Sequence, residues 1–242
     1  MNKKPKSIRI FIGHDSRYPE ASKVCRQSIL KFWPEAKITY LDKATLKENG
    51  MYGREDVEGE STEFSFTRFY IPLIMNYSGY ALFCDNDFLW RVDPREVSRY
   101  IADQPISVVK HKDYVAKSNK MDGIVNKTYP KKNWSSLMLF NCDMLKNKLS
   151  KEYLDKATPS QLHEFKFLNE KSIGEIPKRY NMLVGIDAIT KENARAIHYT
   201  EGGPWFDEYK DAELSEEWWE VCLLYTSPSP RDLSTSRMPS SA

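Results

Sequence analysis

Residues 7–41 alternate between two hydrophobic periods, and this alternation constrains the fold more than any other feature of the sequence. Isoleucines alternate along residues 7–13, which is typical of a strand. Apolar residues then recur at helical spacing over residues 19–33, and residues 38–41 give a second short strand. Strand, helix and strand in about 35 residues make a βαβ unit. The sequence therefore predicts parallel strands joined by a right-handed crossover.

The same alternation continues to residue 199 and predicts one α/β domain with a mostly parallel central sheet flanked by helices. Residues 80–84 are continuously apolar, as expected of a central strand that is covered on both faces. Pro72 falls inside the apolar stripe of residues 66–77, so that helix is predicted to be kinked or split. The other expected elements are helices at 94–102 and 158–170, strands at 106–109, 137–140, 173–176 and 197–199, and surface loops at 47–62 and 111–133.

The end of the chain differs in composition from the rest. From Tyr225 to Ala242 there are six Ser and three Pro in 18 positions, with no hydrophobic period. Such a string is typical of a flexible chain end. It also resembles translated sequencing-adapter read-through, which is the interpretation we favour. We therefore predict a folded domain at residues 1–221 and a disordered tail at 222–242 that takes no part in function.

Charge and cysteine content exclude several classes of protein. The 36 Lys and Arg balance 34 Asp and Glu, for a formal net charge of +2, which excludes a polybasic nucleic-acid binder. The four cysteines form no CxxC pair, and three lie in apolar runs, which predicts buried free thiols in a reducing compartment. No apolar run approaches the ~18–20 residues that span a bilayer, and the N-terminal strand is too short for the apolar core of a signal peptide. We therefore expect a cytoplasmic protein without a transmembrane segment.

Two acids follow the most apolar strand directly. Asp85 and Asp87 come after residues 80–84, and ligands of open α/β sheets bind beyond the carboxyl ends of the strands. Side chains two residues apart in extended chain point the same way, so both carboxylates could hold one hard divalent cation that bridges to phosphate oxygens. The alternative is an ordinary turn, because Asp and Asn are turn formers.

His198 ends another short apolar segment and precedes a pair of glycines. An imidazole with two carboxylates suits Mn²⁺, without excluding Mg²⁺ or Zn²⁺, although a single histidine is often only a packed side chain. Gly202 and Gly203 would let the backbone approach a diphosphate closely, or would simply form a tight turn. Trp205 is the aromatic residue that we expect near a sugar face, whereas its aromatic neighbours are expected in the core or in a capping helix.

Two further residues are candidates for binding. Arg68 lies opposite the apolar stripe of residues 66–77, where it could clamp a phosphate or a sugar hydroxyl or remain solvated. Asp15 lies in the loop after the first strand, where an α/β fold holds a nucleotide. That loop lacks G-x-G-x-x-G, which disfavours a dinucleotide site. The chain also has no P-loop, no G-x-S-x-G elbow and no H-E-x-x-H.

Four segments occur together in the order found in one enzyme family. They are Phe64-Ser-Phe-Thr-Arg-Phe-Tyr-Ile-Pro72, Tyr80-Ala-Leu-Phe-Cys-Asp-Asn-Asp87, Trp134-Ser-Ser-Leu-Met-Leu-Phe-Asn141-Cys and His198-Tyr-Thr-Glu-Gly-Gly-Pro-Trp205. Together they resemble the nucleotide-diphospho-sugar glycosyltransferases of the GT-A fold, and family 8 in particular. The chain is similar to a bacterial and phage-associated branch with Asn-Trp-Ser-Ser and Gly-Gly-Pro-Trp-Phe signatures. The resemblance covers about residues 7–220.

The resemblance implies roles for individual residues. Asp85 and Asp87 match the Asp-x-Asp motif that holds Mn²⁺ (or Mg²⁺), and His198 matches a further metal ligand. The resemblance also places the donor's base, ribose, diphosphate and sugar against five residues: Asp15, Arg68, Asp85, Gly202 and Gly203.

Two departures from family 8 concern catalysis. The family's Asp-Gln-Asp-x-Leu-Asn run corresponds here to Glu164-Phe-Lys-Phe-Leu-Asn169, so phenylalanine stands where a glutamine lies near the anomeric carbon. Glu164 is the remaining candidate for a catalytic residue. The family's basic residue before Pro-Trp is also missing, because glycine precedes Pro204. Neither a retaining nor an inverting outcome is assigned.

The predicted function is transfer of a sugar from a nucleotide donor, most simply a UDP-sugar, to a hydroxyl of a glycan or lipid-linked saccharide. Two alternatives stay open. A sugar-phosphate nucleotidyltransferase could use a similar scaffold, but its usual Gly-rich, basic first loop is absent. A non-catalytic saccharide-binding module could have kept the same fold.

Overall fold

A six-stranded sheet forms the centre of the computed structural model, which describes residues 7–55, 60–101, 103–111 and 130–226. Its order is β2-β1-β3-β6-β5-β7. The strands are β1 (Ile8–Gly13), β2 (Ile38–Leu41), β3 (Tyr80–Cys84), β5 (Ile106–Val108), β6 (Leu137–Asn141) and β7 (Ile173–Glu175). Strand β6 is antiparallel to both neighbours, whereas the β1–β2, β1–β3 and β5–β7 pairs are parallel. The predicted α/β fold with a mostly parallel sheet is therefore confirmed, with one reversed strand inside it.

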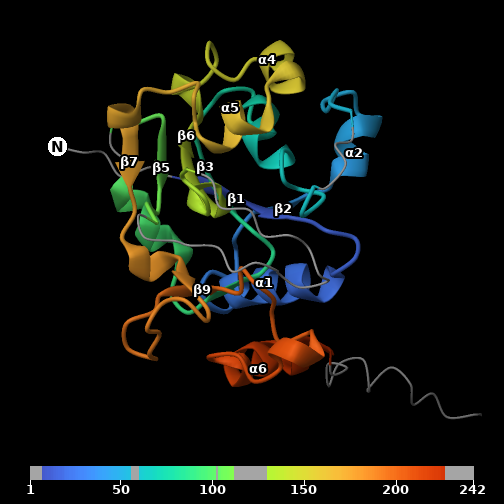
Figure 1. Ribbon diagram of the computed structural model, residues 1–242, viewed down its shortest axis with the longest axis vertical. Coiled ribbons are helices and arrows are strands. Elements are labelled where there is room, and N and C mark those ends of the chain that lie inside the picture. The colour runs from blue at the N-terminus through green and yellow to red at the C-terminus, as the bar shows by residue number, and fades with distance from the viewer. Residues whose placement is uncertain (1–6, 56–59, 102, 112–129, 227–242) are drawn as a thin grey trace, which may run out of the picture.

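Helices cover both faces of this sheet (Figure 1). They are α1 (Pro19–Phe32), α2 (Lys43–Glu48), α3 (Ile71–Ile74), α4 (Lys151–Lys156), α5 (Pro159–His163) and α6 (Ser215–Thr226). Helix α1 lies against one face, α4 and α5 lie on the opposite side, and α6 packs beneath α1, farther from the sheet (Figure 1). Pro19 occupies the first turn of α1, where its missing N–H costs nothing.

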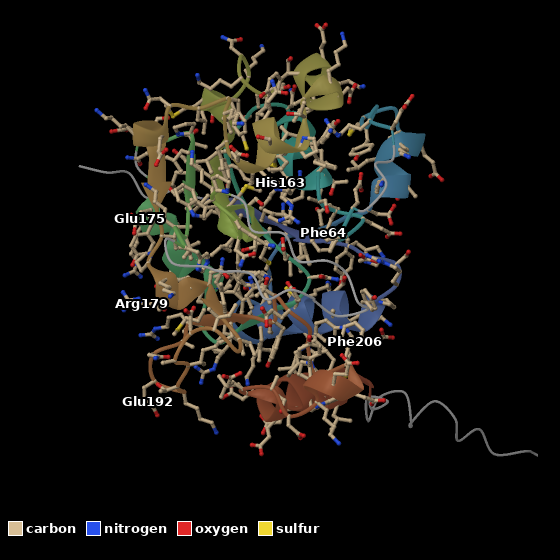
Figure 2. All side chains as sticks on the ribbon, viewed as in Figure 1. Phe64, His163, Glu175, Arg179, Glu192 and Phe206 are labelled. Carbon is tan, nitrogen blue, oxygen red and sulfur yellow. The ribbon has the colours of Figure 1, made fainter. Side chains whose placement is uncertain are left out.

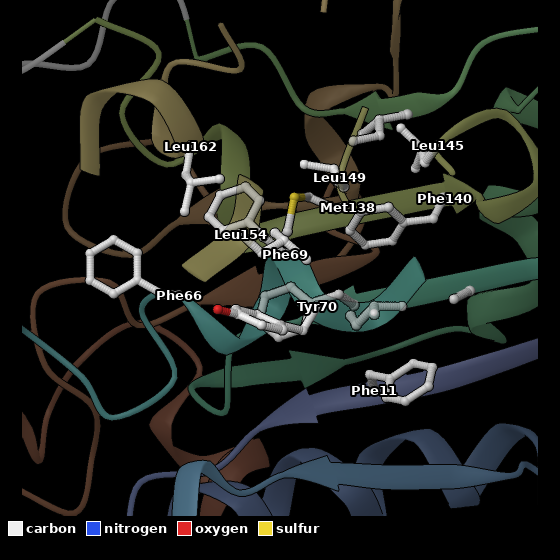
Figure 3. Packing of buried hydrophobic residues seen from close by; sticks show 14 of the residues in the cluster. Phe11, Phe66, Phe69, Tyr70, Met138, Phe140, Leu145, Leu149, Leu154 and Leu162 are labelled. Atoms are coloured by element: carbon white, nitrogen blue, oxygen red, sulfur yellow. The ribbon is translucent and has the colours of Figure 1, made fainter. Parts of the chain in front are cut away.

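The alternation of side chains along the strands divides the core into two layers. Phe11, Phe83 and Phe140 pack with residues of α3, α4 and α5, as the close view in Figure 3 shows for Phe11 and Phe140. Ile10 and Leu139 point the other way and pack on the α1 side. Because successive strand residues face opposite sides, continuously apolar strands such as β3 and β6 supply both layers.

A second, three-stranded sheet lies beside the first. It contains β4 (Phe88–Trp90), β8 (Met182–Leu183) and β9 (Ala196–His198) in the order β4-β9-β8. The prediction that residues 197–199 finish the central sheet is therefore wrong, because β9 pairs with β4 and β8 instead. The strands β4 and β8 are too short, at three and two residues, to give a periodic signal.

Several predicted helices are shorter than their sequence patterns. The stripe at 66–77 is split into a 3₁₀ helix at Thr67–Tyr70 and α3, which confirms the expected effect of Pro72. The helix expected at 158–170 ends at His163, because Phe165 adopts a left-handed φ of 55°. The helix expected at 94–102 is a 3₁₀ helix at Pro94–Tyr100. Most of the loop predicted at 111–133 lies outside the described residues.

The boundary predicted at residue 221 needs correction. Helix α6 runs from Ser215 to Thr226, so the first five residues of the predicted tail are helical. The apolar segment Val221-Cys-Leu-Leu continues the helix, and the Ser- and Pro-rich composition begins only at Ser227. The rest of the predicted tail lies outside the described residues.

All four cysteines are free thiols, and Cys25, Cys84 and Cys142 are buried, as predicted. Burial raises the pKa of Cys142 to about 12, with a smaller contribution from Asp143. Within the described residues, no helix is both long and apolar enough to cross a membrane.

Candidate metal and donor site

The pairing of β4 with β9 brings His198 to the acidic segment after β3. Residue Phe88, the first of β4, pairs with His198, the last of β9. The N–H of Tyr199 donates to the carbonyl oxygen of Asp87 at 3.0 Å. Asp85 is held on its other side, where its N–H donates to the carbonyl oxygen of Ser136 at 3.0 Å. Segments more than 100 residues apart in the sequence thus meet at the carboxyl end of β3.

Asp85, Asp87 and His198 form a candidate metal centre, because one ligand atom of each lies within 4.8 Å of the others. His198 Nε2 lies 3.2 Å from Asp87 Oδ1. His198 as a residue is only 1% exposed, and its ring stacks on Phe88, with 4.6 Å between the ring centroids. Two carboxylates and one imidazole are a donor set that suits Mn²⁺ and related divalent cations. The predicted grouping of these three residues is therefore present, and the donor set by itself does not select one cation.

Arg68 contacts the same site through Asp85. Its Nη1 donates to Asp85 Oδ1 at 2.7 Å and to the carbonyl oxygen of Ser135 at 2.8 Å. Its Nε donates to the carbonyl oxygen of Phe64 at 3.3 Å. The guanidinium also lies over the rings of Phe64 and Phe83. Arg68 is buried, so of the two sequence interpretations the solvated surface arginine is wrong, and it orients Asp85 directly.

Asp15 lies on the loop after β1, and its carboxylate is completely buried. Both of its oxygens accept hydrogen bonds from the Arg17 side chain, at 2.8 and 2.6 Å. The backbone N–H groups of Arg17 and Glu63 add two more, at 3.1 and 3.3 Å. Burial alone would raise the pKa of Asp15, but the hydrogen bonds and charge of Arg17 outweigh it and lower the pKa. In this structure Asp15 therefore fixes the conformation of its own loop.

The glycine pair makes room for two aromatic rings. Gly202 has a φ of 152°, and a Cβ atom there would lie 2.4 Å from the ring of Tyr209. A Cβ atom on Gly203 would lie 1.9 Å from the ring of Trp205. Trp205 in turn packs against Trp218 of α6, with 5.5 Å between the ring centroids. The internal packing alone therefore explains why both positions are glycine.

Glu164 immediately follows α5 and is engaged with its neighbours. It accepts a hydrogen bond from Ser160 Oγ at 2.7 Å and pairs with Lys166 Nζ at 3.1 Å. These two contacts hold the pKa of Glu164 below its usual value. Phe165, which stands at the family's glutamine position, is fully buried in the core. Its side chain can contribute no hydrogen bond to a bound sugar.

Three further residues near the site were not predicted from the sequence. Asn181 contacts His198 Nδ1 through its Oδ1, at 3.0 Å. His163 contacts Ser135 Oγ through its Nδ1, at 3.1 Å, and its ring lies against those of Phe66 and Phe69 (His163 is labelled in Figure 2). His111 follows β5 and is 8% exposed; burial first, and then the charge of nearby His198, lower its pKa to about 3. None of these residues stands in a motif, and only their distant partners in the fold distinguish them.

Comparison with known proteins agrees with this architecture. No family model matches the chain. Protein CDI of Arabidopsis thaliana is 40% identical over 240 residues, which covers 96% of this chain and 92% of that protein. This relative is a plant protein, whereas the sequence motifs resemble a bacterial and phage-associated branch.

Solved structures show the fold. The bifunctional glycosyltransferase WbbM matches with a TM-score of 0.65 and the glycosyltransferase GlyE of Streptococcus pneumoniae TIGR4 with 0.60, both at 14% identity. The chain covers only 52% and 61% of those two proteins, although they cover 97% and 90% of it. Galactosyltransferase LgtC, solved in complex with donor and acceptor sugar analogues, matches with a TM-score of 0.56, at 13% identity and over 99% of its length. At such identities these matches establish the GT-A fold and nothing about substrates.

Proposed function

The chain belongs to the family of Protein CDI and has the GT-A fold, and from this premise we propose that it is a metal-dependent glycosyltransferase. It would transfer a sugar from a nucleotide-diphosphate sugar, in the simplest case a UDP-sugar, to a hydroxyl of a glycan or lipid-linked saccharide. The observation that carries the proposal is the convergence of Asp85, Asp87 and His198 beyond the carboxyl end of β3. That is the edge at which open α/β sheets bind their ligands.

The three side chains would hold a divalent cation that offsets the negative charge developing on a departing diphosphate. Asp87 and His198 meet across the β4–β9 pair, so the backbone pairing fixes the separation of these two ligands. Asp85 is oriented by Arg68, whose guanidinium holds one carboxylate oxygen at 2.7 Å. The Arg68–Asp85 ion pair also reduces the net negative charge at the site, since the guanidinium of Arg68 offsets one of the two carboxylate charges.

The remaining candidates would surround the donor. We assign Asp15 to the shape of the loop after β1, because its carboxylate is already bound by Arg17. Gly202 and Gly203 would present backbone to the diphosphate, and Trp205, half-buried beside them, would border the sugar. Glu164 is the candidate general base or stabilising carboxylate, and its lowered pKa keeps it ionised near neutral pH. Arg68 would reach the donor sugar only through the side of its guanidinium that Asp85 leaves accessible.

Calorimetric titration with UDP-sugars tests the proposal. We expect binding to the wild-type protein in the presence of Mn²⁺ and loss of binding in the Asp87→Ala variant. Removing a direct ligand should weaken Mn²⁺ binding by at least ~100-fold, since even an outer partner of a ligand is worth about 10–100-fold. Product analysis with a panel of glycan acceptors then tests transfer itself.

Asp103→Ala is the matched control, because Asp103 is exposed and precedes β5 at the opposite, amino edge of the sheet. It should bind donor and metal like the wild type. Failure to bind any nucleotide sugar of a broad panel would refute the proposal. Glycan binding that needs no metal would instead support the saccharide-binding module, and release of pyrophosphate from a nucleoside triphosphate would support the nucleotidyltransferase.

A further inference from the structure

The two ring nitrogens of His198 face different partners. Nε2 lies 3.2 Å from Asp87 Oδ1, on the side of the candidate metal centre. Nδ1 lies 3.0 Å from Asn181 Oδ1, on the side away from it. A neutral imidazole carries its single proton on one nitrogen and a lone pair on the other. Only a lone pair on Nε2 can bind a cation, so the tautomer of His198 decides whether the centre is competent.

A chain of hydrogen bonds beyond His198 fixes the orientation of the Asn181 amide. Ser136 Oγ donates to the carbonyl oxygen of Asn133 at 2.7 Å, and a carbonyl oxygen can only accept. The single hydroxyl proton of Ser136 is therefore used, so its oxygen accepts from Asn181 Nδ2 at 2.9 Å. The amide oxygen is then left on the His198 side.

The same chain fixes the proton on His198. Because Asn181 Oδ1 can only accept a hydrogen bond, His198 Nδ1 must carry a proton and donate it to that oxygen. Asn181, Ser136 and His198 are between 0% and 2% exposed, so water does not compete for these bonds. The stacking of the ring on Phe88 holds its plane in place. In the neutral ring, Nε2 is then the bare nitrogen and faces Asp87.

We propose that Asn181 is a positioning residue, held by Ser136, that keeps His198 in the Nδ1–H tautomer with its Nε2 lone pair presented to a divalent cation. The effect on cation binding rests on the proposed function, whereas the tautomer itself does not. Partners of this kind orient metal-binding histidines, and their removal costs about 10–100-fold in metal affinity. An amide does this without adding a charge to a site that already contains two carboxylates and one arginine.

Nitrogen NMR on protein labelled with ¹⁵N-histidine tests the tautomer without any metal. The chain has only four histidines, and the His198→Gln variant identifies the His198 signals by their absence. At a pH at which the ring is neutral, we expect a protonated Nδ1 and a bare Nε2 in the wild type. A protonated Nε2 in the wild-type protein would overturn the inference.

Calorimetric titration with Mn²⁺ alone tests the consequence. Asn181→Leu removes both amide contacts at similar volume and should weaken Mn²⁺ binding by about 10–100-fold, with the His198 proton redistributed between the two nitrogens. Ser136→Ala leaves Asn181 in place but frees its amide to turn, so we expect a smaller loss. An Asn181→Leu variant with wild-type affinity and an unchanged tautomer would contradict the proposal.

Ser28→Ala is the matched control for burial. Ser28 is 0% exposed, donates to the carbonyl oxygen three residues earlier (Cys25, 2.7 Å) and accepts an N–H (Trp90, 3.0 Å), as Ser136 does. It should lose stability like Ser136→Ala but keep wild-type Mn²⁺ affinity and the His198 tautomer. If the wild type binds no Mn²⁺, the proposed function fails while the NMR result still decides the tautomer. If Asn181→Leu does not fold, the wild-type spectrum and Ser136→Ala carry the test.

Discussion

The guanidinium of Arg68 and the carboxylate of Asp85 form a nearly buried ion pair, 2.7 Å apart, with side chains 6% and 15% exposed. Arg68 also donates to two backbone carbonyl oxygens, one before β6 and one in the segment before its own helix. The sequence suggested that Arg68 could clamp a ligand, whereas in the structure it holds Asp85, the first acid of the Asp-Asn-Asp segment. Arg68 therefore acts at the site mainly by orienting Asp85.

Removing only one partner of this ion pair should destabilise the protein strongly. We expect Arg68→Met to lower the free energy of unfolding by about 3–5 kcal/mol, because it leaves the Asp85 carboxylate uncompensated in a poorly solvated site. In an Asp85→Asn background the same substitution should cost less, since no charge is left behind. Urea unfolding of the wild type, both single variants and the double variant measures the coupling.

The exposed pair Arg95–Asp93 provides the comparison for that cycle. Solvent screens such a pair, so the corresponding cycle should show far weaker coupling. An equal cost of Arg68→Met in both backgrounds would mean that packing, and not charge, is what Arg68 supplies.

Gly203→Ala should destabilise the protein through Trp205. The added methyl group would lie 1.9 Å from the indole ring, so the ring must leave its place against Trp218 in the cluster under α6. We expect a loss of about 1–3 kcal/mol, measured by urea unfolding. In a Trp205→Leu background the clash is relieved, and an undiminished cost there would show that the backbone, and not the ring, requires glycine.

Two buried histidines should make the protein acid-sensitive. Burial, followed by the nearby arginines Arg68 and Arg54, lowers the pKa of His163 to about 3, and that of His111 is also about 3. In the unfolded chain both rings take up a proton below the ordinary histidine pKa of 6.5, whereas in the folded protein they stay neutral down to about pH 3. The free energy of unfolding is therefore unaffected by these rings above pH 6.5 and falls as the pH drops from there towards 3. Each ring contributes a slope of about 1.4 kcal/mol per pH unit in that window.

Urea unfolding midpoints measured from about pH 7.5 down to about pH 4.5 check this expectation. His163→Phe should flatten the pH dependence by the share of one proton, because Phe cannot titrate and suits the neighbouring rings of Phe66 and Phe69. A wild-type stability that is constant over this window, or an unchanged slope in His163→Phe, would contradict the assignment.

The C-terminal boundary can be tested by truncation. Trp218 is 1% exposed and Val221 5%, and both pack in the cluster between α1, the second sheet and α6. We propose that a chain ending at Thr226 keeps the wild-type free energy of unfolding and metal affinity. A chain ending at Leu214 should lose cooperative unfolding, because it exposes that cluster. Loss of stability in the chain that ends at Thr226 would show that residues 227–242 contribute to the fold.

The sequence by itself predicted the local elements whose signal is local. The periodicities of β1, α1, β2 and β3 gave their positions to within a residue or two, because burial on one face or both imposes a repeat of 3.6 or 2 on the apolar residues. The Asp-Asn-Asp segment was placed at the correct end of β3 for the same reason. The grouping of Asp85, Asp87 and His198 followed from the family resemblance, and the structure brings one ligand atom of each within 4.8 Å of the others.

Tertiary structure alone decided how distant segments meet. It inserted β6 in reverse between β3 and β5, gave β9 to a second sheet, and paired Arg68 with Asp85. It also set Asn181 against His198, 17 residues away in sequence. Strand partners and buried polar contacts depend on which surfaces remain to be covered once the whole chain has packed. A pattern of apolar residues records that a side chain is buried, whereas the identity of what lies against it is a property of the assembled fold.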